Sequence, residues 1–281
     1  MLTVSIIGAG DLGGAVAETL AERDRIHRLL LVDVVGSVAA GKALDVQQMG
    51  AVQGFHTRLD GTDDPSRVIG SAVCVVADRY GRSSAEWQGD EGVAMLRGLA
   101  PYLGGAPLVF AGALPADLLS SAVRDLKIPH RRVLGSSSEA FRSAVAAIVA
   151  VEAACSPGEV GLTVLGSPGR FVVPWSETSI GGYALERVLS QVQLTRIEAR
   201  AAKLWPPGPL TLGIAAARVS EALVESSRQS YSVLTMLGGE FGVKDRIGTL
   251  PVFLSPTGIE HARVPSLSPR ERVLVDTALG G

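Results

Sequence analysis

The chain has 281 residues, of which 47% are hydrophobic and 19% are charged, and its formal net charge is −2. This length suits two domains or one large one, and the balanced charge gives no basis for a nucleic-acid or acidic-lipid partner. No apolar run reaches the length of a membrane span, and the first strand is expected to start without a signal peptide, so we expect a cytoplasmic protein with no membrane partner. Cys74, Cys155 and the four scattered histidines lack metal-ligand spacing, which predicts buried free thiols and no metal site.

The first predicted strand runs into a G-x-G-x-x-G turn made by Gly8, Gly10 and Gly13, with Asp11 and Leu12 between the last two. In such a turn the first glycine permits the tight bend and the second admits a pyrophosphate. The third lets helix and strand pack closely. The N–H groups at the start of the following helix then face a phosphate, where the helix dipole favours negative charge. The turn therefore predicts a dinucleotide-binding site.

Asp33 ends the second predicted strand and lies 20 residues past Gly13. An acid at this distance accepts hydrogen bonds from the adenosine ribose. A 2′-phosphate at the same place would meet a carboxylate, so the sequence predicts NAD rather than NADP as the cofactor.

Short apolar runs alternate with helical patterns through the first half. Strands are predicted over residues 3–8, 29–33, 55–59, 72–77, 107–111 and 131–135, and helices over 12–23, 37–50, 85–100 and 115–125. This alternation predicts a Rossmann-type doubly wound parallel sheet of the α/β class, with helices on both faces. The nucleotide lies across the carboxyl ends of the strands, and Asp33, Ala77 and Asp78 all fall on that rim.

The pattern changes after Gly135. Helices are predicted over residues 138–154, 183–204 and 212–226 and after Ser268-Pro269, and strands over 161–165, 171–174, 230–236 and 251–255. This mixture predicts a second, α+β domain. We expect a nucleotide-binding domain over residues 1–135 and a substrate-type domain over 136–281, joined by a tight interface.

Several runs of sequence, taken in their order and spacing, carry a resemblance to a known family. They are residues 6–13, 30–34, 41–45, 132–135, 147–152, 219–223, 239–245, 250–252 and 258–260. Together they resemble the lactate/malate dehydrogenase family over nearly the whole chain. The resemblance implies hydride transfer between NAD and a small 2-hydroxy or 2-oxo acid, and a homo-oligomer.

The family's chemistry needs a histidine as acid/base, held by an aspartate. That histidine follows a Gly-Gly pair and precedes a Val-Pro. In this chain its position falls on Ser167 or Pro168. Neither side chain can shuttle a proton at neutral pH, and no histidine is near in sequence.

The family also places an aspartate and a carboxylate-binding arginine as D-x-x-R on one helix. An ungapped alignment puts Phe141 and Ala144 at these positions. A shift of two residues puts Glu139 and Arg142 there, which keeps the spacing and the charges. The sequence leaves both alignments open.

A second arginine, on a mobile loop after the fourth strand, polarises the substrate carbonyl in the family. The loop of this chain keeps Arg79 and Arg82 but lacks the Pro-Arg-x-Pro-Gly pattern. The family's asparagine after the fifth strand is replaced by Ala113 or Leu114. The catalytic candidates are therefore Arg142, Glu139 and Arg82.

Three interpretations follow. The first is a divergent NAD-dependent oxidoreductase whose acid/base is Tyr80, Glu139 or a water. The second is an inactive dinucleotide-binding protein that acts as a sensor or partner subunit. The third, a remnant that binds no cofactor, conflicts with the intact glycines and Asp33. The sequence does not decide between the first two, because fold-level resemblance alone does not establish activity.

Overall fold

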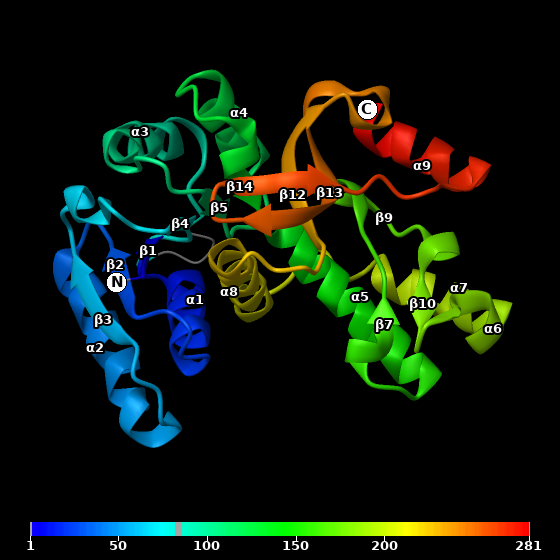
Figure 1. The fold of residues 1–281 in the computed structure, drawn as a ribbon, viewed down its shortest axis with the longest axis horizontal. Coiled ribbons are helices and arrows are strands. Elements are labelled where there is room, and N and C mark those ends of the chain that lie inside the picture. Colours follow the sequence, from blue (N-terminus) through cyan, green and yellow to red (C-terminus); the bar gives the residue numbers. More distant parts are fainter. Residues whose placement is uncertain (1, 82–85, 281) are drawn as a thin grey trace.

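The first half of the chain folds as a parallel sheet with strand order β3-β2-β1-β4-β5-β6 (Figure 1). The computed structural model describes residues 2–81 and 86–280. The strands are β1 Thr3–Ile7, β2 Arg28–Val32, β3 Arg58–Thr62, β4 Val73–Val76, β5 Leu108–Phe110 and β6 Val133–Gly135. The helices are α1 Asp11–Glu22, α2 Gly36–Gln53, α3 Gly89–Leu99 and α4 Ala116–Arg124. The predicted doubly wound sheet is confirmed.

Both faces of this sheet are buried, which explains why its strands are continuous apolar runs. Successive side chains of a strand point to opposite faces. Ile6 therefore packs with α1 and α2 on one face, and Ile7 packs with α3 and α4 on the other.

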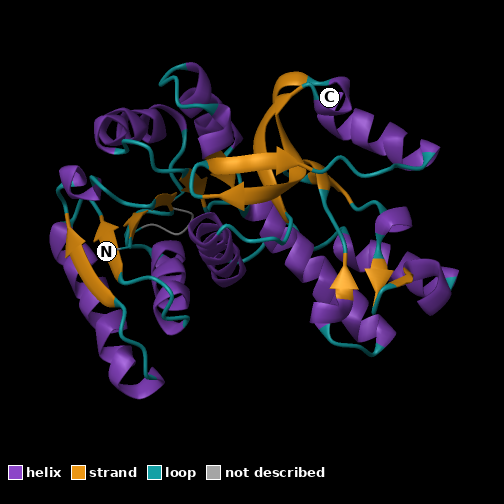
Figure 2. Cartoon of the chain, in the orientation of Figure 1, coloured by secondary structure: helices purple, strands orange, loops and turns teal. Residues whose placement is uncertain are grey.

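The main sheet continues past residue 135, because β12 pairs antiparallel with β6 (Figure 2). The later strands are β7 Val160–Gly161, β8 Leu165–Ser167, β9 Arg170–Val172, β10 Ser179–Ile180, β11 Tyr183–Ala184, β12 Tyr231–Gly238, β13 Lys244–Ser255 and β14 Gly258–Ala262. The later helices are α5 Ser137–Ala153, α6 Leu185–Val188, α7 Gln191–Ala201, α8 Pro209–Glu225 and α9 Pro269–Gly280. Strands β7, β10 and β11 form a separate small sheet.

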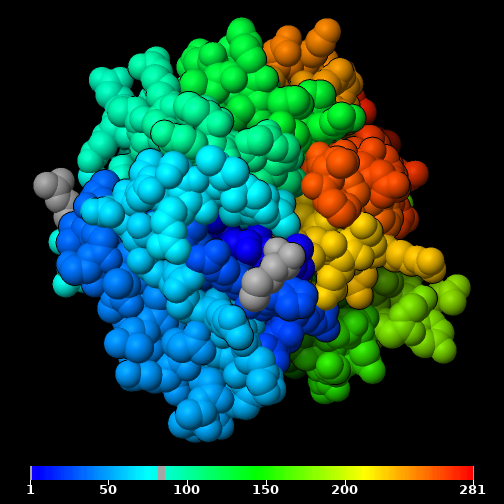
Figure 3. All heavy atoms as spheres, turned by 60° about the vertical axis from the view of Figure 1, so that its left-hand side comes forward, coloured from blue at the N-terminus to red at the C-terminus, as the bar shows by residue number. Residues whose placement is uncertain are grey.

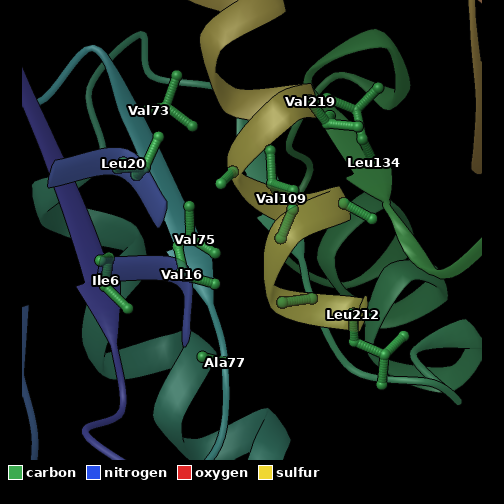
Figure 4. Close-up of a cluster of buried hydrophobic side chains, with 14 of the residues drawn as sticks. Ile6, Val16, Leu20, Val73, Val75, Ala77, Val109, Leu134, Leu212 and Val219 are labelled. Carbon is green, nitrogen blue, oxygen red and sulfur yellow. The ribbon is translucent and has the colours of Figure 1, made fainter. Parts of the chain in front are cut away.

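Helix α8, from the second half, packs against α1 and covers part of the first-half sheet. Figure 4 shows Leu212 and Val219 of α8 beside Val109 and Leu134, with Val16 of α1 nearby. A Cβ on Gly213 would lie 2.6 Å from the Cβ of Ala15, so the two helices meet at close range. The second half therefore completes the core under the glycine turn.

The prediction of one helix over residues 183–204 is wrong. Residues 183–184 form β11, and a new helix starts after Ser190. The Ser190 hydroxyl accepts from the Gln193 N–H, and the Gln193 side-chain oxygen accepts from the Ser190 N–H. This capping box starts a helix and therefore separates α7 from α6.

Two strand predictions also differ from the structure. The single strand over 161–165 is replaced by the short strands β7 and β8. The strand over 251–255 is the end of the longer β13, which pairs with an unpredicted β14 through a turn at Pro256-Thr257. No helix of the described residues is both long enough and apolar enough to cross a bilayer.

The start of α9 is fixed by the carboxylate of Glu271, which is 8% exposed. It accepts hydrogen bonds from the N–H and hydroxyl of both Ser176 and Ser268. Burial raises the pKa of Glu271, but these hydrogen bonds outweigh it and hold the pKa below its usual 4.5.

This lowered pKa predicts a pH-dependent stability. At a pH between the lowered pKa of Glu271 in the folded protein and its usual pKa of 4.5 in the unfolded chain, the unfolded chain binds more protons. The contribution of Glu271 to the free energy of unfolding is therefore complete above pH 4.5 and is lost as the pH falls through the folded-state pKa. In denaturant unfolding, the free energy of unfolding should fall less between pH 7 and pH 4 in Glu271→Gln than in the unmodified protein. Equal losses in the two proteins would contradict this assignment.

Candidate functional site

The glycine turn and Asp33 meet at the carboxyl end of the parallel sheet. The Gly8 N–H donates to the Val32 carbonyl at 2.7 Å, and the Ala9 N–H donates to Oδ2 of Asp33 at 2.8 Å. Oδ1 of Asp33 accepts from the Val35 N–H at 3.1 Å. Asp33 is 4% exposed. The predicted placement of the turn and the acid on one rim is confirmed.

The Ala77 and Ala111 backbones lie on the same rim. The Ala77 N–H donates to the Ile7 carbonyl at 2.9 Å, and the Ala111 N–H donates to the Val76 carbonyl at 2.9 Å. Ala77 itself is buried in the core beneath the turn (Figure 4). This rim is therefore the edge of the nucleotide site that the sequence predicts.

A carboxylate occupies the start of α1. Oδ1 of Asp78 accepts from the Gly13 N–H at 2.9 Å, and Oδ2 accepts from the Leu12 N–H at 3.1 Å. A Cβ on Gly10 would lie 2.4 Å from Oδ2 of Asp78. Gly10 thus admits a side chain of this chain at the place predicted for the pyrophosphate.

The Asp78 carboxyl is half-buried, and its pKa is raised. Burial is the main cause, and the negative charge of Asp11 adds to it. The N–H groups of Gly13 and Leu12 lower the pKa and offset part of the rise. Asp11 begins α1 and is exposed, so the helix start carries two acids.

The segment after β4 covers the site at two further points. The Tyr80 N–H donates to Oδ2 of Asp33 at 3.4 Å. Asp78 and Glu86 form an isolated antiparallel bridge, and the Glu86 carboxylate accepts from the Ala113 N–H at 2.7 Å and the Leu114 N–H at 3.3 Å. Arg82, a catalytic candidate, lies outside the described residues.

A cavity of about 360 Å³ adjoins Asp33. Its apolar wall comes from the ends of β1 and β2, from Trp87 and from α3: Ile7, Val32, Trp87, Met95 and Leu99. Arg79 also lines this cavity, and its guanidinium lies 5.0 Å from the Trp87 ring centre and forms an ion pair with Glu91. In Figure 3 the deep-blue N-terminal segment is visible between the cyan residues and the yellow of α8.

Ser167 and Pro168 lie in the hairpin that joins β8 and β9. The Ser167 hydroxyl donates to the Ala278 carbonyl at 2.9 Å. Phe171 of β9 stacks on Phe141 of α5, with ring centres 4.8 Å apart, and meets the edge of Trp205 at 4.8 Å. An aromatic cluster therefore fills the space between this hairpin and α5.

Glu139 and Arg142 form an ion pair one turn apart on α5, with a fully buried carboxylate and a partly buried guanidinium. Glu139 is fully buried, and both its oxygens accept from the Arg142 guanidinium at 2.6–2.9 Å. Oε2 also accepts from the Ser232 N–H at 3.0 Å. Burial lowers the pKa of Arg142, but the charge and hydrogen bonds of Glu139 outweigh it and raise the pKa.

Arg142 also lines a separate open cavity of about 640 Å³. That cavity contains no residue of the glycine turn or of the β8–β9 hairpin. Within the described residues no group of three His, Cys, Asp or Glu side chains could hold a metal ion.

No family model matches the chain. The malate dehydrogenase of Thioalkalivibrio sulfidiphilus is 29% identical, over 100% of this chain and 97% of the relative. The malate dehydrogenase of Cytophaga hutchinsonii is 27% identical, over 99% of this chain and 94% of the relative.

Two solved structures share the fold. The malate dehydrogenase of Aeropyrum pernix has a TM-score of 0.89 at 22% identity, over 99% of this chain and 95% of that one. The lactate dehydrogenase of Cryptosporidium parvum, solved with lactic acid and NAD, has a TM-score of 0.88 at 21% identity, over 99% of this chain and 94% of that one.

Over nearly its whole length the chain is similar to proteins named malate dehydrogenase, and it shares the fold of solved lactate and malate dehydrogenases, which supports the lactate/malate dehydrogenase family. Its fold and the position of its glycine turn are those expected of a lactate/malate dehydrogenase relative. The sequence analysis placed Asp78 on this rim but did not predict that its side chain occupies the start of α1, and it missed Glu86. The signal for the rim position of Asp78 was its place two residues after the end of β4 in a parallel sheet.

Proposed function

We propose that this lactate/malate dehydrogenase relative does not transfer hydride to 2-oxo acids, which agrees with the second interpretation above in the loss of catalysis but not in the binding of a dinucleotide. The proposal rests on the sequence alignment, which puts Ser167 or Pro168 at the family's histidine position, and on the β8–β9 hairpin in which both residues lie. Proline has no side-chain proton to give. The Ser167 hydroxyl already donates its hydrogen bond to the Ala278 carbonyl, and a serine hydroxyl does not give up its proton near neutral pH.

The other acid/base candidates are poorly placed for the reaction. Glu139 is fully buried, and both its oxygens are bound by Arg142 and Ser232. Tyr80 is 59% exposed, so water surrounds its hydroxyl rather than an enclosed site. A general acid must reach the carbonyl oxygen within hydrogen-bond distance in a site that excludes water.

The position of Phe141 supports the ungapped alignment. In the family the aspartate must contact the histidine, and in this chain it is Phe141 that contacts the hairpin, through Phe171. Glu139 instead accepts from the Ser232 N–H of β12 and pairs with Arg142. Arg142 is then a structural cation, since the charge that would hold a substrate carboxylate is already neutralised by Glu139.

The fit of NAD to these residues is partial. Asp33 stands where the adenosine ribose needs an acceptor, and the apolar cavity beside it accepts a base. The Asp78 carboxylate, however, takes the N–H groups of Leu12 and Gly13. Those N–H groups would hold the pyrophosphate, so the residues present do not fit an intact dinucleotide, and we derive no step through NAD.

The test is steady-state NADH oxidation with pyruvate and oxaloacetate from pH 5 to 9. We expect rates at the level of the protein-free control at every pH, because residues 2–81 and 86–280 place neither a proton donor nor an unpaired carboxylate-binding cation at the positions that the alignment gives them. Turnover whose pH profile shows one essential group near neutrality would overturn the proposal and reveal an acid/base at another position.

A further inference from the structure

The carboxylate of Asp78 stands in for a phosphate at the start of α1. The N–H groups of Leu12 and Gly13 belong to the first turn of the helix, where unpaired donors and the helix dipole attract an anion. Both donate to Asp78, at 3.1 and 2.9 Å. The anion site of this Rossmann fold is thus filled from within the chain.

The backbone of Asp78 is held as closely as its side chain. The Gly10 N–H donates to the Asp78 carbonyl at 3.4 Å, and a Cβ on Gly8 would lie 1.9 Å from that carbonyl oxygen. Movement of Asp78 away from the glycine turn would break the hydrogen bond from the Gly10 N–H and the close packing against Gly8. A dinucleotide would have to displace a carboxylate whose backbone remains in place.

The charges around the site disfavour phosphate groups further. Asp11 lies beside Asp78 at the helix start, and Asp33 and Asp63 line the adjoining cavity. The one cation that lines the cavity among the described residues, Arg79, is paired with Glu91. A phosphate in this cavity would add negative charge next to Asp33 and Asp63, and the charge of Arg79 is already offset by Glu91.

The cavity beside Asp33 suits a smaller, uncharged ligand. Its volume of about 360 Å³ is near the lower end of the range of roughly 300–1,000 Å³ for ligand sites. Trp87, Met95 and Leu99 offer apolar contact to a flat base. Oδ1 of Asp33 accepts from the Val35 N–H and has a second lone pair, which can accept from a ribose hydroxyl.

We propose that Asp78 is a built-in anion that makes this site select a nucleoside without phosphate groups over a dinucleotide. This inference goes beyond the proposed loss of hydride transfer, because it concerns binding and not chemistry. It assigns the site a ligand class, a neutral nucleoside with a free vicinal diol.

The test measures binding of adenosine, ADP and NAD to the full chain by calorimetry. For the unmodified protein we expect adenosine to bind at least ten times more tightly than ADP or NAD. In Asp78→Gly the N–H groups of α1 become free, so the order should reverse while adenosine binding stays within about threefold. Asp78→Asn, which keeps an acceptor but removes the charge, should fall between the two.

The matched control is Asp117→Asn, an exposed acid in the first turn of α4, which should leave all three affinities unchanged. The proposal is overturned if the unmodified protein binds ADP or NAD more tightly than adenosine. It is also overturned if adenosine does not bind, or if folded Asp78→Gly and Asp78→Asn proteins keep the original order.

Activity separates this inference from the proposed function. Asp78→Gly that binds NADH but still does not reduce oxaloacetate would support both. Asp78→Gly that binds NADH and reduces oxaloacetate would support the binding inference and overturn the proposed loss of catalysis. Tight NAD binding by the unmodified protein together with no turnover would overturn the binding inference and support the proposed loss of catalysis.

Discussion

Gly8→Ala should destabilise the protein by about 3–5 kcal/mol, measured as a lower midpoint of denaturant unfolding. Gly8 has a φ of +110°, which a side chain strains, and an added Cβ would lie 1.9 Å from the carbonyl oxygen of Asp78. The atoms in its way belong to backbone, which cannot rotate aside. The substitution must therefore open the contact between the glycine turn and the segment after β4.

Gly54→Ala is the matched control. Gly54 ends α2 with a φ of +84°, but no atom lies within 4 Å of an added Cβ. Gly54→Ala should be destabilised by only about 1 kcal/mol, because alanine adopts this positive φ less readily than glycine. Equal losses in the two variants would show that the segment after β4 moves freely away from the turn.

The prominent features of the nucleotide site were predictable because they are local in the sequence. A strand, a glycine turn, a helix and a second strand ending in an acid fix their own geometry within 33 residues, and Gly8 and Asp33 lie together as expected. The rim position of Ala77 followed from the direction of parallel strands. Patterns of this kind need no knowledge of distant contacts.

The occupant of the anion site was not predictable in the same way. Asp78 was placed on the correct rim, but whether its side chain faces solvent or α1 depends on how the whole segment after β4 packs across the turn. An acid after a strand carries no periodic signal for that choice. The capping box at Ser190 is local and could have been recognised, but the apolar residues on both sides of it suggested one helix.

The alignment of α5 shows a different limit. Glu139 and Arg142 keep the charges and spacing of the family's D-x-x-R, so the sequence alone leaves the shifted alignment open. The structure gives the pair its own role. The two side chains neutralise each other and join α5 to the backbone of β12 through Ser232.

Arg142→Ala should therefore act on stability. It leaves the carboxylate of Glu139, which is fully buried, without its cation, and removing one partner of a buried ion pair costs about 3–5 kcal/mol. The measurement is the free energy of unfolding in denaturant. The same substitution in the exposed pair of Arg25 with Glu225 should cost about 0–1 kcal/mol.

A double variant tests the cause of this loss. Glu139→Gln removes the buried charge but keeps an acceptor for the Ser232 N–H, so Arg142→Ala in that background should cost roughly half as much or less. An arginine that served to bind a substrate carboxylate would behave differently, because its removal would leave the unfolding free energy nearly unchanged. The small effect of removing such an arginine on the unfolding free energy would be the same in the Glu139→Gln background, because its partner would be the ligand and not Glu139.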